Sequence, residues 1–165
     1  MLGTLAFLSR QISRATLAFA ALGLVVMTAV IGWQVFARYV LHDAPSWAEQ
    51  ASLVLMIWYV FLAAAVGVRE QFHIAMTAVT NAMPAPLAKA SRYLALALVA
   101  LFGAAMGVWG FELVLRTWAI NIPTLEIPRG FAYVPLPMAG WLIVFFSFEH
   151  MVAELRGEKV EPLWS

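Results

Sequence analysis

Residues 15–39 read ATLAFAALGLVVMTAVIGWQVFARY and contain no acidic or basic side chain before Arg38. A helix needs about 20 apolar residues to cross the hydrocarbon core of a bilayer, so this stretch predicts a transmembrane helix. Arg10 and Arg14 precede it, as basic residues precede the core of a secretory signal. A signal core is only about 7–15 residues long. We therefore interpret residues 15–39 as a helix that the mature protein keeps.

Three further stretches, residues 47–68, 93–115 and 134–152, meet the same length criterion. The composition agrees, because 64% of the 165 residues are hydrophobic and 12% are charged, against about 45–50% and about 25% in soluble domains. A chain of this size has too little interior to hide so much apolar surface from water. The sequence predicts an all-α integral membrane protein, with residues 1–165 forming a single membrane domain of four transmembrane helices.

The composition also excludes several classes of function. A net charge of +1 leaves no basic excess for binding nucleic acid. With 0 cysteines, the chain cannot form disulfides, thiolate metal sites or a cysteine nucleophile. Its sequence contains no P-loop and no recognisable pairing of a nucleophile with a base. We predict that the protein is not an enzyme and that it carries no cofactor.

The lysines and arginines between the spans and at their ends predict the orientation. Seven of them fall on the side of the two termini, and three fall on the other side. The first group is Arg10, Arg14, Arg69, Lys89, Arg92, Arg156 and Lys159; the second is Arg38, Arg116 and Arg129. Because positive charge is enriched in cytoplasmic loops, we expect both termini in the cytoplasm.

The segment between the second and third spans has a helical pattern of its own. Within residues 72–83, Phe72, Met76 and Met83 fall on one face and His73 falls on the other. This pattern predicts a short amphipathic helix that lies in the cytoplasmic-side interface of the membrane. The alternative is a second span that continues past Arg69.

The segment between the third and fourth spans, residues 117–137, contains prolines at positions 123, 128, 135 and 137. Proline cannot continue a helix, so we expect this loop to cross the outer surface as extended turns. Pro135 is suitably placed to be an early residue of the fourth span.

Ionisable side chains inside a span are costly, which makes each one a candidate functional group. Arg116 follows Glu112 by four residues, the favourable order for a helical ion pair, so we interpret the two as a structural pair rather than an ion relay. Glu149 and His150 near the cytoplasmic end of the fourth span indicate interface anchors or polar contacts with a neighbouring helix. His73 and His150 leave open a small membrane cytochrome with haem held by two histidines.

The outer end of the first two spans carries several polar residues. Ser46 and Glu49 have the spacing of a capping box, which would satisfy the first amides of the second span. Trp47 suits the aromatic belt at the membrane surface. Arg38 is not explained in this way; it is expected to pair with Asp43 or Glu49 or to face a partner.

Small residues form two further patterns. Gly103 and Gly107 form a GxxxG motif in the third span, and Ala63 with Gly67 repeats this spacing in the second. Such faces allow helices to approach closely in lipid. The sequence leaves open whether each face contacts another helix of this chain or a separate subunit.

Several segments together resemble the small permease subunit of tripartite ATP-independent periplasmic (TRAP) transporters, the DctQ-like family. They are WQVFARYV at 33–40, PSWAE at 45–49, FLAAAVGVR at 61–69, His73-Ile74, and IPTLEIP at 122–128. Their order and spacing over nearly the whole chain carry the resemblance. The sequence departs from the family at Gln50, where many members have a second acid.

The resemblance implies a non-catalytic subunit of the bacterial inner membrane. A large membrane subunit is expected to carry substrate and sodium, and a periplasmic binding protein to deliver a carboxylate or sugar acid. On this view Arg38, Arg116, Glu126 and Arg129 contact the binding protein, while Met76, Gly103 and Gly107 contact the large subunit. Membrane lipids cover the rest, and Ser46, Trp47, Glu49, His73 and Glu112 are structural. A small transporter acting by itself is a further alternative.

Overall fold

The computed structural model describes residues 2–43, 45–80 and 84–156. In chain order it contains α1 (Leu2–Phe36), the short π-helix η1 (Ala37–Leu41), α2 (Ser46–Thr80), α3 (Ala85–Thr117), β1 (Asn121–Ile122), β2 (Ile127–Pro128), α4 (Arg129–Tyr133) and α5 (Pro135–Arg156). Four stretches, Phe7–Leu41, Ser46–Glu70, Pro86–Thr117 and Arg129–Arg156, are long and apolar enough to cross a membrane. The predicted all-α membrane fold with four spans is confirmed.

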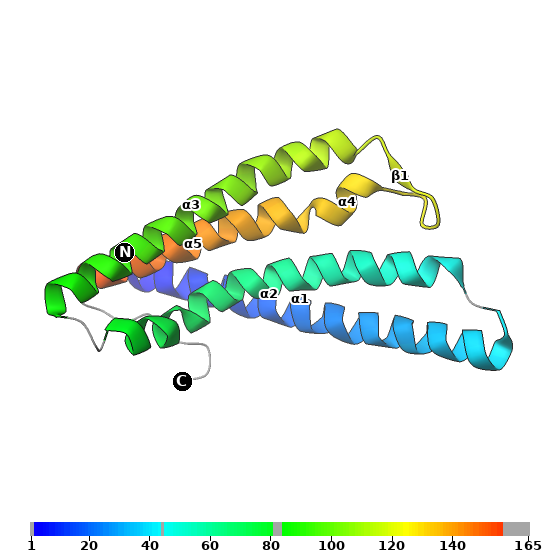
Figure 1. The fold of residues 1–165 in the computed structure, drawn as a ribbon, viewed down its shortest axis with the longest axis horizontal. Helices are drawn as coiled ribbons and strands as arrows, with labels where there is room; N and C mark the ends of the chain where they lie inside the picture. The colour runs from blue at the N-terminus through cyan, green and yellow to red at the C-terminus, as the bar shows by residue number, and fades with distance from the viewer. Residues whose placement is uncertain (1, 44, 81–83, 157–165) are drawn as a thin grey trace.

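The four long helices pack as two antiparallel pairs (Figure 1). Helix α1 packs mainly on α2, and α3 packs mainly on α5, while contacts between α2 and α5 join the pairs. In Figure 1 the pairs lie together at the end that holds the N-terminus and separate toward the β1–β2 hairpin. In the most apolar 18-residue stretch of each helix, 44% of the residues are buried in α5 and 6% in α1. Helix α5 is therefore central and α1 peripheral.

Helix α2 continues without a break through most of the segment predicted to be an interfacial helix. It ends at Thr80, and residues 81–83 lie outside the described part of the chain. The helical character of residues 72–80 agrees with their apolar periodicity, but they extend α2 instead of starting a new helix. Their position in the membrane interface stays a prediction.

The outer loop is partly helical, which corrects the expectation of extended turns throughout. Strands β1 and β2 form a small antiparallel hairpin, with Ile122 paired to Ile127. Helix α4 then begins directly after Pro128, and α5 begins at Pro135 as predicted. Proline is tolerated at a helix start, because its missing N–H would have no partner in the helix there. These prolines therefore begin helices instead of preventing them.

Candidate partner-binding surfaces

Arg38 lies in the π-helix that ends the first span. The amides of His42 and Asp43 both donate to the carbonyl oxygen of Ala37, and His42 has a left-handed backbone with φ 57°. Arg38, Asp43 and Glu49 are all exposed. Within the described residues Arg38 forms no ion pair with Asp43 or Glu49, so its side chain is directed to the surroundings. π-Helical turns are rare and often mark functional positions.

Two other predicted outer residues, Glu126 and Arg129, are exposed on the loop that precedes α5. Glu126 has a positive φ of 55° at the turn of the β1–β2 hairpin, and its amide donates to the carbonyl of Ile122 at 2.9 Å. The amide of Arg129 donates to the carbonyl of Ile120 at 2.7 Å. The backbone thus holds both charged residues in defined positions on the molecular surface.

The predicted pair of Glu112 and Arg116 is present on α3. Arg116 Nη2 lies 2.6 Å from Glu112 Oε1, and Arg116 Nε donates to the same oxygen at 3.0 Å. The side chains are 51% exposed for Glu112 and 75% exposed for Arg116. The pair therefore stands on the surface of a helix that crosses the membrane.

Helix α2 begins at Ser46, where the capping signal predicts it, with Glu49 in the first turn. The amide of Ala48 donates to the carbonyl of Pro45 at 3.3 Å. The reciprocal side-chain bonds of a capping box are not formed among the described residues. Trp47 is 42% exposed, which suits the predicted aromatic belt.

Gly103 and Gly107 face α5 of the same chain. A methyl group at Gly103 would lie 2.8 Å from Ile143 Cγ2, and one at Gly107 would lie 2.9 Å from Trp141 Cε2. A methyl group at Gly140, on the α5 side, would lie 2.5 Å from the amide nitrogen of Gly107. The three glycines form a close helix seam. Helix α5 of the same chain occupies the face that Gly103 and Gly107 share, and their contact with the large subunit stays a prediction.

The second small-residue pattern makes no comparable seam. A methyl group built at Gly67 meets no atom within 4 Å. The side chains of Met76 and His73 lie outside the described part of the structure. The contact of Met76 with a large subunit and the structural role of His73 therefore stay predictions.

A buried polar cluster joins α1, α2 and α5 near the N-terminal end of the bundle. Arg69 is 3% exposed and Glu149 9%. Arg69 Nε donates to Ser9 Oγ at 2.8 Å and to Glu149 Oε2 at 3.3 Å, and Ser9 Oγ donates to the same carboxylate oxygen. Arg69 Nη1 donates to Glu70 Oε1 at 2.6 Å, and His150 Nε2 lies 3.0 Å from the Arg69 carbonyl oxygen.

This cluster confirms polar contacts with neighbouring helices for Glu149 and His150. Sequence reasoning missed the roles of Arg69, counted only as a loop charge, and of Ser9. The sequence contained one signal, because Ser9 and Ser13 are four residues apart and therefore share a face of a helix. The structure shows that both are fully buried. Near the same end, Arg92 Nε lies 2.8 Å from Glu154 Oε1 and ties α3 to α5.

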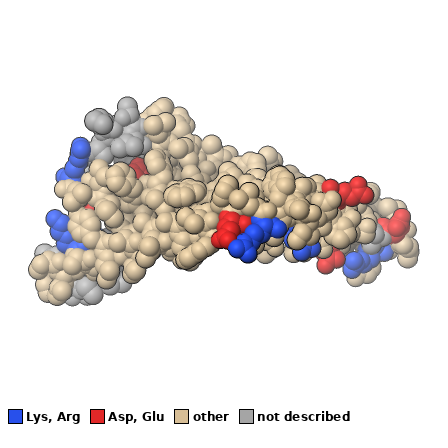
Figure 2. Space-filling view, turned by 90° about the horizontal axis from the view of Figure 1, so that it is seen from above, with Lys and Arg blue, Asp and Glu red and all other residues tan. Residues whose placement is uncertain are grey.

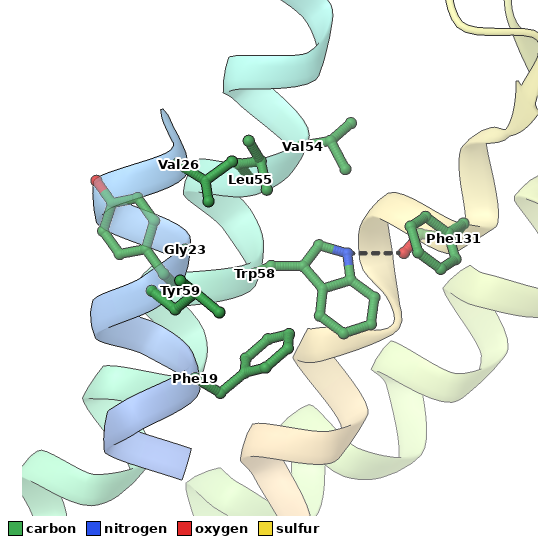
Figure 3. Close-up of a pocket in the computed structure, with 9 residues that line it drawn as sticks. Phe19, Gly23, Val26, Val54, Leu55, Trp58, Tyr59 and Phe131 are labelled. Atoms are coloured by element: carbon green, nitrogen blue, oxygen red, sulfur yellow. Dashed lines mark hydrogen bonds between the residues drawn. The ribbon is translucent and has the colours of Figure 1, made fainter. Parts of the chain in front are cut away.

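An open apolar groove of about 360 Å³ lies between α1, α2 and α4 (Figure 3). Trp58 forms its centre, with Phe19 on one side and Phe131 on the other, at ring-centroid distances of 6.0 and 5.1 Å. The indole N–H of Trp58 donates to the carbonyl of Phe131 at 3.3 Å. The rest of the groove is lined by Leu22, Gly23, Val26, Val54, Leu55 and Tyr59. Because the indole N–H of Trp58 already has an acceptor, the groove suits an apolar occupant. The same hydrogen bond connects α2 to α4.

Comparisons with known proteins agree with this architecture. The family model for tripartite ATP-independent periplasmic transporters, DctQ component, matches residues 27–157. The C4-dicarboxylate TRAP transporter small permease protein DctQ of Rhodobacter capsulatus is 30% identical over 101 residues, which are 60% of this chain and 44% of that protein. The chain therefore matches less than half the length of that relative.

Two further relatives align over more of their length. The sialic acid TRAP transporter small permease protein SiaQ of Vibrio cholerae is 26% identical over 124 residues, 74% of this chain and 71% of that protein. A TRAP transporter small permease protein of Haemophilus influenzae is 27% identical over 143 residues, 82% and 86% respectively. None of these similarities supports the cytochrome alternative.

Proposed function

The chain belongs to the DctQ family of tripartite ATP-independent periplasmic transporters, and from this premise we propose that it is the small subunit that scaffolds a large transport subunit and helps to dock a periplasmic binding protein. It is a multi-pass subunit of a membrane transporter in the bacterial inner membrane. We propose that both termini lie in the cytoplasm, in agreement with the distribution of lysine and arginine.

The buried charges of the chain support the proposed scaffold role. Arg69 and Glu149 are paired with each other and with Ser9, across three helices. This arrangement stabilises the bundle and commits these charges to structure. A bundle whose buried ion pair joins its own helices suits a subunit that supports transport by another chain.

The exposed charges at the outer end of the chain support the proposed docking role. Arg38, Glu126 and Arg129 are exposed, and Figure 2 shows acidic and basic residues mixed at the end opposite the N-terminus. A surface with both signs of charge can steer a soluble partner and fix its orientation. Arg116 is exposed as well, but it is paired with Glu112 and is therefore left out of the proposed docking surface.

The substrate class follows from the names of the relatives. Two of them are small permease proteins for C4-dicarboxylates and for sialic acid, and both ligands are acids. We propose sodium-driven uptake of a carboxylate or a sugar acid, with substrate and sodium bound by the large subunit.

Isolation of the tagged chain from its native membrane in mild detergent tests the scaffold role. We expect a much larger multi-span protein in a fixed molar ratio, identified by peptide sequencing, and no haem absorbance. A lone chain, or one with a haem spectrum, would contradict the proposal. Uptake into vesicles that contain this chain alone would favour a self-sufficient transporter instead.

Charge reversal tests the docking role. In vesicles that contain the complete transporter, R38E with R129E should raise the binding-protein concentration needed for half-maximal uptake by about tenfold. The matched control is K89E, an exposed charge at the other end of the bundle, which should leave that concentration unchanged. Equal effects of both variants, or loss of the large subunit from R38E/R129E, would refute docking by these residues.

A further inference from the structure

The first turns of α1 have two sides that differ in what they contact. Ser9 and Ser13 are fully buried, and Ser9 belongs to the polar cluster that joins α1 to α2 and α5. Phe7, Gln11 and Arg14 follow one another at spacings of four and three residues, and all three are exposed. Residues with these spacings share one side of a helix. This side of α1 is directed away from the rest of the bundle.

A pocket of about 260 Å³ lies on this outward side. The described residues that line it are Phe7, Arg10, Gln11 and Arg14. The two guanidinium groups and the carboxamide all donate hydrogen bonds, and none of these four residues carries a negative charge. The lining of the pocket is therefore suited to an anion that offers several oxygen acceptors.

The positive charge beside this pocket is less well neutralised than elsewhere in the chain. Arg69, Arg92 and Arg116 each form an ion pair with a glutamate, whereas Arg14 forms none among the described residues. Arg10 stands four residues before Arg14 and is half-buried, with an interaction of its own in the chain. Like charges four residues apart on a helix repel each other. An anion bound beside both arginines relieves this repulsion.

The sequence places the pocket at one end of the first span. Residues 15–37 contain no acidic or basic side chain, and about 20 apolar residues cross the hydrocarbon core of a bilayer. Arg14 and Arg38 bound this stretch, so both lie at the level of the lipid headgroups. Of the four spans, α1 has the smallest buried share in its most apolar stretch. Phosphates of lipid headgroups are therefore the anions at the level of Arg14.

We infer that Arg10, Gln11 and Arg14 form a binding site for the headgroup of an anionic phospholipid. Arg14 and Gln11 donate hydrogen bonds to the phosphate oxygens, and Arg10 adds positive charge on the side toward the bundle. Phosphatidylglycerol suits the site because its headgroup has no positive charge to neutralise the phosphate. Phosphatidylethanolamine suits it less, since the described lining residues offer no carboxylate to its ammonium group. The inference extends the proposed function without depending on it, because it uses only the position of α1 in a membrane.

Arg38, at the other end of the same span, provides an internal comparison. It is exposed and forms no ion pair among the described residues, as is true of Arg14. No second lysine or arginine lies within four residues of Arg38, and Asp43 follows five residues after it. A single arginine near an acidic residue attracts a phosphate less strongly than two arginines one turn apart. Arg38 is therefore a matched control for Arg14.

Native mass spectrometry of the full chain, purified in detergent and freed of native lipid, tests the site. Titration with phosphatidylglycerol measures the fraction of chains that carry one lipid. R14A should raise the lipid concentration for half-occupancy about fivefold, the loss expected for one charge at the membrane surface. R38A should raise it by less than about twofold. Equal effects of R14A and R38A would overturn the site, and equally tight binding of phosphatidylethanolamine would overturn the anionic headgroup.

Thermal unfolding in detergent separates lipid binding from folding and from capture of a free anion. Without lipid, R14A should unfold at the temperature of the parent, because Arg14 is exposed and forms no ion pair among the described residues. Phosphatidylglycerol should raise the unfolding temperature of the parent more than that of R14A, since a ligand stabilises the state that binds it. Inorganic phosphate at the same concentration should leave the parent unchanged. Equal stabilisation by inorganic phosphate, or an equal lipid effect on both proteins, would refute a phospholipid site at Arg14.

Discussion

Two arginine–glutamate pairs of this protein have the same chemistry and very different surroundings. Arg69 and Glu149 have side chains that are 2% and 7% exposed, and they connect residues from three helices through Ser9. Arg116 and Glu112 belong to a single helix and are 75% and 51% exposed. A buried pair between two helices fixes how the helices meet, because separating them would leave buried charge without its partner on the other helix. An exposed pair within one helix leaves the fold almost unaffected.

The largest effect should come from breaking the buried pair on one side. E149A removes the carboxylate that joins Arg69 to α5 and leaves Arg69 paired with Glu70 of its own helix, which should lower the free energy of unfolding by up to about 3–5 kcal/mol. Thermal unfolding of the purified chain in detergent measures this change. The control is E154A, since Glu154 and Arg92 form a pair that is 28% and 33% exposed. An equal loss in both variants would show that burial does not distinguish these pairs.

The seam between α3 and α5 should be the next most sensitive region. In G140A the new methyl group would meet the Gly107 amide nitrogen at 2.5 Å and the Gly103 carbonyl oxygen at 2.7 Å. Backbone atoms on both sides cannot move away cheaply, so we expect a loss of about 1–3 kcal/mol. G67A has open space around its methyl group and should be neutral or slightly stabilising. A neutral G140A in the same unfolding measurement would show that the seam can widen freely.

Replacing both buried charges should cost less than removing one. In R69M/E149L the Arg69–Glu149 pair and its desolvation cost disappear together, whereas Glu70 loses its contact with Arg69, so we expect a loss of stability that is smaller than that of E149A. The comparison variant is E149A, measured under the same conditions. If the double variant is less stable than E149A, the cluster stabilises through its hydrogen bonds with Ser9 and Glu70 more than through its charges.

The smallest effect should come from the exposed pair. E112Q in the isolated chain should change the free energy of unfolding by less than about 0.5 kcal/mol, because exposed pairs within a helix contribute little. The same unfolding measurement checks this change. A loss near that of E149A in the isolated chain would contradict the distinction drawn between the two pairs.

Local features of this protein could be predicted from its sequence. The four spans depend on length and hydropathy within single segments, and the Glu112–Arg116 pair depends on a spacing of four residues in one helix. The start of α5 at Pro135 follows from the backbone of proline alone. Each of these features is decided by residues that are close together in the chain.

Features that depend on helix packing could not be predicted in the same way. Ser9 and Glu149 are 140 positions apart, so no local pattern links them. Gly103 and Gly107 form a motif suited to close contact, but the motif does not say which helix fills it. The structure shows that α5 fills it.

The length of the first span has a consequence for the bilayer itself. Phe7–Leu41 is a single stretch of 35 residues, and its uncharged part between Arg14 and Arg38 alone is about 35 Å long. A hydrocarbon layer of about 30 Å accommodates such a helix if the helix tilts by about 30° or the layer thickens around it. Because α1 is the peripheral helix, this mismatch acts on the surrounding lipid. Membrane thickness should therefore influence the tilt angle of the first span. Because α1 and α2 form a hairpin, that tilt should also change the orientation of their outer end relative to the membrane surface.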